Sequence, residues 1–196
     1  ADTCLELQQM FDTYAYDNAV IFGHAKDGNI HFLITDRFEG EENLARYNGF
    51  NDDLASLIIG RHGNLKAEHG TGRVMAPFVR QQFGDELYEV MVALKRAVDP
   101  RGTMNPGVII SEDPEEHLHN MKLNPTVEEA VDRCVECGFC EPVCPSRDLT
   151  MTPRQRIVVR RARAKALADG NVDAARELDE AYVYEGEQTC AADSMC

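Results

Sequence analysis

Residues 23–31 read Gly-His-Ala-Lys-Asp-Gly-Asn-Ile-His, and this stretch determines the fold that we expect for the first half of the chain. Its Asp27-Gly28 pair is a strong hairpin signal, because glycine readily adopts the positive φ that a tight turn requires. We therefore predict two antiparallel strands, over residues 18–24 and 29–35, joined by a two-residue turn.

Two histidines flank this predicted turn. A two-residue turn places His24 directly opposite His31, with the two Cβ atoms roughly 5 Å apart. Imidazoles at that separation suit one metal ion. The alternative is that both are ordinary polar residues on the solvated face of a hairpin, and the pattern alone leaves both interpretations open.

A glycine-rich loop, Glu68-His69-Gly70-Thr71-Gly72-Arg73, combines a carboxylate, an imidazole and a guanidinium. Glu68 can complete a metal site of two imidazoles and one carboxylate, with an open position for substrate. His69 can act as a general base, because imidazole titrates near neutral pH. Arg73 can bind a substrate carboxylate through two parallel hydrogen bonds. The alternative interpretation is an ordinary helix-capping turn.

The apolar pattern of the remaining first half predicts mainly helices. Apolar residues within 85–98 recur at the i, i+3, i+4, i+7 spacing of an amphipathic helix, and Asp99-Pro100 ends it. The other elements predicted here are two helices and one short strand, at residues 3–16, 41–61 and 65–68. We expect the second of these helices to be broken near Gly49. An α+β fold follows, in which a partial antiparallel sheet is accompanied by helices.

The composition is that of a globular and acidic protein. The 196 residues are 43% hydrophobic and carry 20 Lys and Arg against 34 Asp and Glu, a net charge of −14. Such a chain repels phosphate backbones, so we expect no nucleic-acid partner. No apolar run approaches the ~20 residues that span a bilayer, and no signal peptide opens the chain. We expect a cytoplasmic protein whose parent reaches the inner membrane only peripherally, through a partner.

The composition changes after the first region. Residues 111–125 contain two prolines and six acidic or histidine residues among few large apolar ones, which is typical of a linker. We therefore expect an oxidase-like region, a linker and a second domain, at residues 1–110, 111–127 and 128–196. Within the second domain, a basic helix over residues 153–168 and a helix over residues 172–184 are joined by Asp169-Gly170-Asn171.

Residues 134–145 read Cys-Val-Glu-Cys-Gly-Phe-Cys-Glu-Pro-Val-Cys-Pro. This C-x2-C-x2-C-x3-C-P run is typical of a ferredoxin-type 4Fe–4S cluster, and its fourth cysteine usually serves a second cluster. We predict a small, mostly helical, ferredoxin-like domain in which Cys134, Cys137 and Cys140 hold one cluster and Cys144 contributes to another. A structural zinc site is the alternative, although a zinc ribbon needs two separated CxxC pairs.

Two further cysteines supply the beginning of a second run. Cys190 and Cys196 have the same six-residue separation as the first and third cysteines of the first run, with Asp193 at the middle position. Cys196 is the last residue here, so we expect a truncated domain. Its second cluster, held by Cys144, Cys190 and Cys196, is then a 3Fe–4S centre or a labile 4Fe–4S centre. The alternative is that both are unrelated thiols.

Three motifs, in this order, resemble the C-terminal part of FAD-linked oxidases. They are residues 23–31, residues 68–73 and the run Lys-Arg-Ala-Val-Asp-Pro-Arg-Gly-Thr-Met-Asn-Pro-Gly at residues 95–107. The similar enzymes are the D-lactate, glycolate and D-2-hydroxyglutarate dehydrogenases of the vanillyl-alcohol-oxidase superfamily. The cysteine domain that follows is similar to the iron–sulfur half of bacterial fusions. The resemblance implies that the first region is part of the substrate (cap) domain, whose other strands come from upstream.

The resemblance also implies roles for single residues. The family's divalent-metal ligands, usually zinc ligands, match three positions: His24, His31 and Glu68. His69 matches the residue beside the flavin that takes the proton of the substrate hydroxyl. Asn105 lies in the Asn-Pro-Gly segment that runs back to the flavin domain, which implies that it approaches the isoalloxazine ring. Leu33 departs from the pattern, because better-known members have an asparagine there that touches substrate.

The activity implied by the resemblance is the oxidation of a D-2-hydroxy acid, such as 2-hydroxyglutarate, lactate or glycolate. FAD in a preceding domain takes the hydride, and the clusters pass electrons singly to a quinone or a carrier protein. No glycine-rich pyrophosphate loop occurs in the 196 residues, so we expect this piece to bind FAD weakly and to be inactive alone. Exposed strand edges invite pairing with a second copy. The rival interpretations are an electron-transfer module without a catalytic site and a structural zinc-binding interaction domain.

Overall fold

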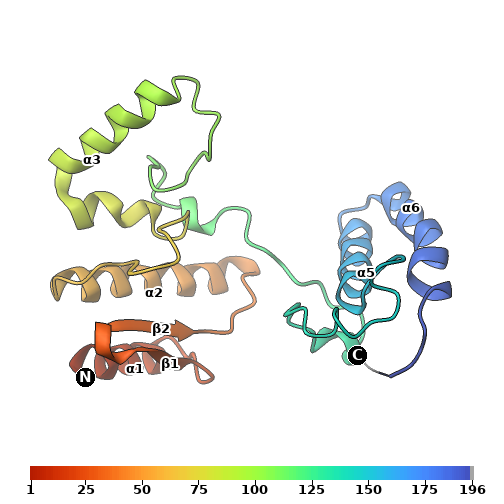
Figure 1. The fold of residues 1–196 in the computed structure, drawn as a ribbon. Helices are drawn as coiled ribbons and strands as arrows, with labels where there is room; N and C mark the ends of the chain where they lie inside the picture. The colour runs from red at the N-terminus through yellow and green to blue at the C-terminus, as the bar shows by residue number, and fades with distance from the viewer. Residues whose placement is uncertain (195–196) are drawn as a thin grey trace. The chain divides into compact units, whose positions relative to one another are not determined.

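The computed structural model describes residues 1–194 and divides the chain into two compact units, Ala1–Leu123 and Asn124–Cys196. Helices predominate, and the described residues contain one two-stranded antiparallel sheet, in the first unit (Figure 1). The α+β class predicted from the sequence is confirmed. Among the helices that the structure describes, none combines the length and the apolar character needed to cross a bilayer.

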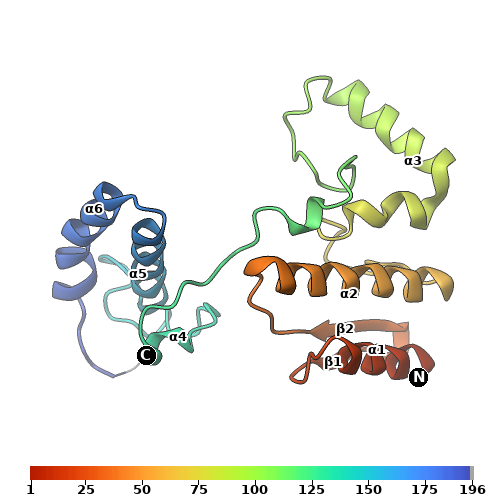
Figure 2. The ribbon, with the colours of Figure 1, turned by 180° about the vertical axis from the view of Figure 1, so that it is seen from behind.

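The first unit is built around a hairpin and two helices. Its elements are α1 (Asp2–Thr13), β1 (Val20–His24), η1 (Ala25–Asp27), β2 (Asn29–Leu33), α2 (Gly40–Gly60), η2 (Ala76–Phe78), α3 (Val79–Val98) and η3 (Glu116–Leu118). The core forms where α1 and α2 pack against one face of the hairpin (Figure 2). Phe11 and Phe50 are enclosed there, with ring centroids 5.9 Å apart. The strand predicted over residues 65–68 is wrong, because these residues belong to the loop between α2 and η2.

The connection of the hairpin is longer than the sequence predicted. Four residues, 25–28, join the strands through a 3-10 turn, and Gly28 ends that turn with a φ of 65°. His24 consequently pairs with Asn29, so the predicted direct pairing with His31 is wrong. The register differs by two residues. Since side chains alternate between the faces of a strand with a period of two, His24 and His31 still share one face.

The two faces of the hairpin have different surroundings. Ile21, Ile30 and Phe32 on one face pack against the core. The other face carries the two histidines and exposes three large apolar side chains, those of Val20, Phe22 and Leu33. The ring of His31 stacks on that of Phe22, with centroids 5.2 Å apart. The histidine face is therefore partly apolar and is not covered by the described part of the unit.

α2 is continuous, so the predicted break near Gly49 is wrong. A Cβ atom at Gly49 would lie 3.2 Å from the ring and the hydroxyl of Tyr14, the residue that follows α1. The glycine thus lets the end of α1 approach α2 closely. A glycine inside a helix costs about 1 kcal/mol relative to alanine, and the burial of Phe50 and Leu54 from the same helix offsets that cost.

α3 begins at Val79 and changes direction at Gly84, where φ is 79° and ψ is 165°. The helix predicted over residues 85–98 forms its second part. The predicted apolar stripe is present there but exposed, at Leu87, Val90, Leu94 and Val98. Hydrophobic periodicity therefore predicted the helix correctly, but within the described unit the stripe covers no core.

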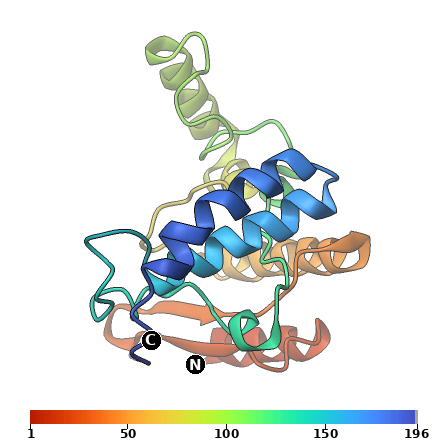
Figure 3. The ribbon, with the colours of Figure 1, turned by 90° about the vertical axis from the view of Figure 1, so that its right-hand side faces the viewer.

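The second unit is a pair of helices preceded by the cysteine-bearing loop. Its elements are α4 (Glu129–Asp132), α5 (Pro153–Ala168), α6 (Val172–Tyr182) and the π-helical turn η4 (Val183–Gln188). α5 and α6 lie side by side (Figure 3), as the turn between them predicted. A capping box begins α5: Thr152 accepts from the backbone N–H of Gln155, and the Gln155 side chain accepts from that of Thr152.

His117 anchors the segment that follows α3. It is only 3% exposed, although it lies in the polar stretch over residues 111–125 whose composition is typical of a linker. Its ring lies between those of Tyr47 and Phe78, at centroid distances of 6.2 and 5.7 Å. Burial lowers the pKa of His117 below its ordinary value, so the imidazole is neutral in the folded protein.

Protonation of His117 therefore opposes folding. Its pKa is lower in the folded state than in the unfolded state, so the unfolded chain takes up the proton first as the pH falls. Between about pH 7 and pH 5, the free energy of unfolding should fall more for the wild type than for His117→Phe, which keeps a ring at this position. Urea unfolding followed by circular dichroism measures both, and an equal pH dependence would contradict the prediction.

Candidate functional site

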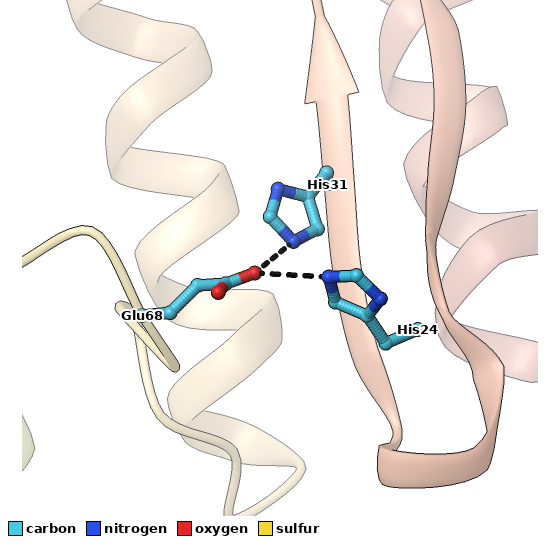
Figure 4. A group of neighbouring side chains, drawn as sticks. All are labelled: His24, His31 and Glu68. Carbon is cyan, nitrogen blue, oxygen red and sulfur yellow. Dashed lines mark ion pairs between the residues drawn. The ribbon is translucent and has the colours of Figure 1, made fainter.

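His24, His31 and Glu68 converge in the first unit (Figure 4). The Oε1 atom of Glu68 lies 2.6 Å from Nε2 of His31 and 3.3 Å from Nε2 of His24. Each residue offers one ligand atom, and these atoms all lie within 4.8 Å of one another. In the part of the chain that the structure describes, this is the one group of side chains spaced to hold a single metal ion.

The hairpin and a loop position the three ligands. His24 ends β1 and His31 lies within β2, on the same face. Glu68 comes from the loop between α2 and η2. Asn29, which pairs with His24 across the hairpin, donates from Nδ2 to Oε1 of Glu68 over 2.8 Å. The loop carboxylate is thereby tied to the strand that carries His31.

Asn29 is a residue of this site that the sequence did not reveal. It stands two residues before His31 in β2 and therefore points to the same face. The predicted strand over residues 29–35 already included Asn29, but only the observed register places Asn29 opposite His24.

His31 is the enclosed member of the group. Its side chain is 18% exposed, against 61% for His24. Its Nε2 atom is buried and, although Glu68 is close, makes no hydrogen bond of normal geometry with any described residue. A buried nitrogen without a hydrogen bond is unfavourable unless a ligand takes its lone pair. The position of His31 therefore favours a bound ligand.

The donor set fits a divalent metal ion. Desolvation acts to raise the pKa of Glu68, but the hydrogen bond from Asn29 and the nearby imidazoles outweigh it, and the pKa lies below its usual range. Two imidazoles and one ionised carboxylate are a common zinc ligand set. Ligand atoms of a tetrahedral zinc ion are roughly 3.3 Å apart. Glu68 and His24 have this spacing, whereas Glu68 and His31, at 2.6 Å, would move apart to hold the ion. A fourth position stays open for substrate or water.

His69 borders the group. Its Nε2 atom lies 3.6 Å from Oε1 of Glu68, and its ring is 5.4 Å from that of His31. The backbone turns sharply here, since His69 and Gly70 have φ values of 64° and 73°. The side chain of His69 is exposed, so its imidazole is accessible to a molecule bound beside the three ligands.

A cavity of about 290 Å³ adjoins the ligands. Asn29, His31, Glu68 and His69 contribute polar groups to its wall, and apolar side chains from β2, α2 and the adjoining loops form most of the remainder. A small organic molecule would thus meet the candidate metal ligands on one side and an apolar surface on the other.

Arg73 does not join this group. Its Nε donates to Oε1 of Glu116 over 2.8 Å, and its Nη2 contacts the same oxygen. Glu116 also accepts from Oγ of Ser111, and its carboxylate fills the space that a Cβ atom at Gly107 would need. The guanidinium is therefore engaged within the chain, and its role toward a substrate carboxylate stays a prediction.

Asn105 is exposed on the loop that follows α3. Asp99 fixes the start of this loop, because it accepts from Nζ of Lys95 over 2.8 Å and from the backbone N–H groups of Thr103 and Met104. These bonds lower the pKa of Asp99 to about 2. Asn105 thus follows a rigid turn, and its approach to a flavin stays a prediction.

The cysteines of the first run lie in the loop before α5. They are free thiols that differ in exposure: Cys134 and Cys140 are half-buried, Cys137 is exposed and Cys144 is buried. Arg161 of α5 fixes the start of the run, since its Nη2 donates to the carbonyl of Cys134 over 2.8 Å and its Nη1 pairs with Glu136. The helix therefore organises the loop through a buried ion pair.

Cys144 and Cys190 line one cavity of about 230 Å³, together with Asp193. The structure thus brings two of the predicted ligands of the second cluster to one place, although they are distant in sequence. Cys196, the third predicted ligand, lies outside the described residues.

A family model described as "FAD linked oxidases, C-terminal domain" matches residues 1–109. The chain belongs to this family. The candidate metal ligands, His69, Arg73 and Asn105 all lie within the matched residues. The family domain therefore carries every candidate site residue of the first unit.

The chain is similar to curated oxidases and dehydrogenases. The glycolate oxidase subunit GlcD of Bacillus subtilis is 33% identical over 50% of this chain and 21% of its own length. The probable mitochondrial D-lactate dehydrogenase of Danio rerio is 36% identical over 46% of this chain and 18% of its own length. This chain thus spans about a fifth of the length of these relatives. No solved structure matches it.

One relative matches beyond the family domain. The D-2-hydroxyglutarate dehydrogenase of Escherichia coli is 28% identical over 88% of this chain and 19% of its own length. The first unit holds residues 1–123, under two thirds of the chain, so this match extends into the second unit. The similarity therefore includes part of the cysteine-bearing half.

The geometry of the three ligands predicts zinc binding by the 196-residue chain. Glu68→Gln and His31→Ala should each weaken it about tenfold or more, because each removes one ligand. Isothermal titration calorimetry with Zn²⁺ measures the affinity, after alkylation of the thiols so that cysteines do not compete. His62→Ala, at an exposed position just after α2, is the matched control. Equal affinities of His31→Ala and the wild type would refute the site.

Proposed function

We propose that this chain is part of a flavin and iron–sulfur dehydrogenase that oxidises a D-2-hydroxy acid. The convergence of His24, His31 and Glu68, with His69 beside them, in a member of the FAD-linked oxidases is the observation that carries the proposal. The relatives are named for glycolate, D-lactate and D-2-hydroxyglutarate. All three compounds are 2-hydroxy acids, which makes this the substrate class.

The proposed metal ligands are His24, His31 and Glu68, and the proposed ion is zinc. A divalent ion, when bound there, polarises an oxygen of the substrate as a Lewis acid. Asn29 orients the Glu68 carboxylate by a hydrogen bond, and such an outer partner fixes the geometry of a ligand. The exposed side chain of His24 marks the open side of the group, where substrate can enter.

His69 is the proposed general base. A substrate hydroxyl held beside Glu68 lies near the His69 imidazole, because the two side chains are 3.6 Å apart. Nε2 of His69, acting as the base, accepts the hydroxyl proton. FAD, when bound by a preceding domain, supplies the hydride acceptor, and Asn105 is the proposed residue of this chain that approaches it.

Arg73 is the proposed partner of the substrate carboxylate. The side chain of Glu116 now occupies the guanidinium, through contacts to both Nε and Nη2. A bidentate arginine–carboxylate pair is geometrically specific. In this proposal the carboxylate of the substrate exchanges with that of Glu116, so binding competes with an ion pair within the chain.

We further propose that the second unit is a ferredoxin-type iron–sulfur domain. One cluster would be held by Cys134, Cys137 and Cys140, and the other by Cys144, Cys190 and Cys196. Each thiolate of a cubane binds a different iron, so its sulfurs need not meet at one point as they must around zinc. The C-x2-C-x2-C-x3-C-P spacing of residues 134–145 favours clusters over zinc. Clusters, when bound, carry electrons singly to a quinone or carrier protein.

The FAD-binding domain is the proposed partner of the first unit. The histidine face of the hairpin exposes Phe22 and Leu33, and α3 exposes Leu87 and Leu94. Uncovered apolar surfaces of this kind mark interaction sites. The strand edges of the two-stranded sheet are the proposed alternative contact, with a second copy of the chain.

Replacing His69 should abolish flavin reduction by substrate in the FAD-loaded holoenzyme that contains this chain. Loss of a general base costs about 10²–10⁴ in rate, so His69→Ala should slow the bleaching of flavin absorbance to that extent. Stopped-flow absorbance with D-lactate, glycolate and D-2-hydroxyglutarate measures the rate. His62→Ala should bleach normally, and a wild-type rate in His69→Ala would show that the catalytic assignment is wrong.

Anaerobic reconstitution should load the 196-residue chain with both iron and sulfide. Cys137→Ser should lose the visible absorbance of the first cluster, because the thiolate it removes lies in the C-x2-C-x2-C run. Cys4→Ser, which changes the cysteine of α1, should not. Analysis of iron, zinc and acid-labile sulfide checks the metal. A chain that retains zinc and takes up no sulfide would show a structural zinc site instead.

A further inference from the structure

Arg156 is a buried cation in the wall of the cavity that Cys144 and Cys190 share. It lies in the first turn of α5 and is only 8% exposed. Much of the surrounding wall is apolar and includes Pro145 and Ile157. Water screens a charge only weakly in such surroundings, so the charge of Arg156 acts strongly on whatever occupies the cavity.

The backbone of the second unit holds the guanidinium in place. Nε of Arg156 donates to the carbonyl of Gly186 over 2.7 Å. Gly186 lies in the π-helical turn η4 and packs on the ring of Tyr182, where a Cβ atom would come within 2.6 Å. π-helical turns are rare and occur frequently at functional sites. Here the turn directs a carbonyl group at Arg156 and fixes its orientation.

The remaining nitrogens of Arg156 make no ion pair with the residues that the structure describes. Nη1 lies 3.9 Å from Sγ of Cys144, and Nη2 is buried without a hydrogen bond among the described residues. The hydrogen-bond neighbours of this guanidinium among residues 1–194 are a thiol and a carbonyl. The carboxylate of Asp193 lines the same cavity.

The other arginines of α5 show that this is exceptional. Four of them each pair with a carboxylate: Arg154, Arg160, Arg161 and Arg163. Arg161 is as deeply buried as Arg156, at 5% exposure, but Glu136 neutralises it. A buried charge without a partner is unfavourable, so the placement of Arg156 indicates that a negative group belongs in the cavity.

We propose that Arg156 is a positioning residue for an iron–sulfur cluster bound by Cys144 and Cys190, an inference that rests on the iron–sulfur part of the proposed function. A cluster with thiolate ligands carries net negative charge, and hydrogen bonds to its sulfurs tune it. Arg156 supplies both the counter-charge and the donors, through Nη1 at the Cys144 sulfur and through Nη2. Its fixed orientation means that these donors are in place before the cluster assembles.

A consequence follows for the reduction potential. One-electron reduction adds negative charge to a cluster, and a fixed buried cation stabilises the reduced form more than the oxidised form. The charge of Arg156 therefore raises the potential of the cluster beside it. A residue that only filled space or supported the fold would leave the potential unchanged.

The test compares Arg156→Gln and Arg156→Lys in the 196-residue chain, reconstituted anaerobically with ferrous iron and sulfide. A potentiometric titration with dithionite, followed by electron paramagnetic resonance, gives the midpoint potential, and Cys190→Ser identifies which signal belongs to the cavity. Arg156→Gln should lower that potential and release iron to a chelator about tenfold faster. Arg156→Lys should restore most of the potential, because it keeps the charge.

Arg176→Gln is the matched control, since it removes the same charge from an exposed position on α6 that pairs with Asp173. Circular dichroism establishes that each variant folds. An unchanged midpoint potential in folded Arg156→Gln would overturn the inference about Arg156, whereas the iron–sulfur proposal would still stand. If the loaded chain keeps all of its electron paramagnetic resonance signals in Cys190→Ser, no cluster is bound in this cavity, and the inference is overturned as well. A wild type that takes up neither iron nor sulfide would overturn the iron–sulfur proposal itself.

Discussion

The candidate site of the first unit depends on the contact between the Glu68 carboxylate and the histidine face of the hairpin. The strands alone leave His24 and His31 as diagonal neighbours, with ring centroids 5.3 Å apart. One oxygen of Glu68 approaches both imidazoles and accepts from Asn29. These contacts outweigh desolvation and keep the carboxylate ionised. Without Glu68, the two histidines would have no third metal ligand, and no side-chain contact of Glu68 would hold the neighbouring His69 beside the hairpin.

The face of the hairpin was predictable from the sequence, whereas its register was not. The positive φ of Gly28 serves a two-residue turn and the observed 3-10 turn equally well, so the local signal cannot choose between them. The resulting error was two residues, and alternation with a period of two made it harmless for His24 and His31. The same error concealed the role of Asn29, because the predicted register set His31 opposite His24 where the structure sets Asn29.

Hydrophobic periodicity predicted the positions of the helices better than it predicted which of their side chains are buried. Leu87 and Leu94 follow the amphipathic spacing, yet they are exposed, while His117 is buried in a segment that reads as polar. The spacing of one helix is a local property, but burial depends on partners that are distant in sequence. The ion pair of Arg73 with Glu116 has the same character, since it joins residues 43 positions apart. The motifs therefore predicted the candidate site residues, but contacts between residues distant in sequence determine which of these residues lie together.

Buried groups without hydrogen bonds distinguish residues prepared for a ligand from residues that only stabilise the fold. Both nitrogens of His117 lack hydrogen-bond partners among residues 1–194, but the neighbours of the ring are Tyr47 and Phe78. Its lowered pKa keeps it neutral, so it needs no ligand. Nε2 of His31 lies beside a carboxylate and a second imidazole, and Nη2 of Arg156 belongs to a side chain that lines a cavity with two thiols. A buried polar group without a partner lowers the stability of the fold. A ligand that supplies the missing partner recovers that free energy as binding affinity. Ligand binding at His31 should therefore stabilise the first unit, and ligand binding at Arg156 should stabilise the second.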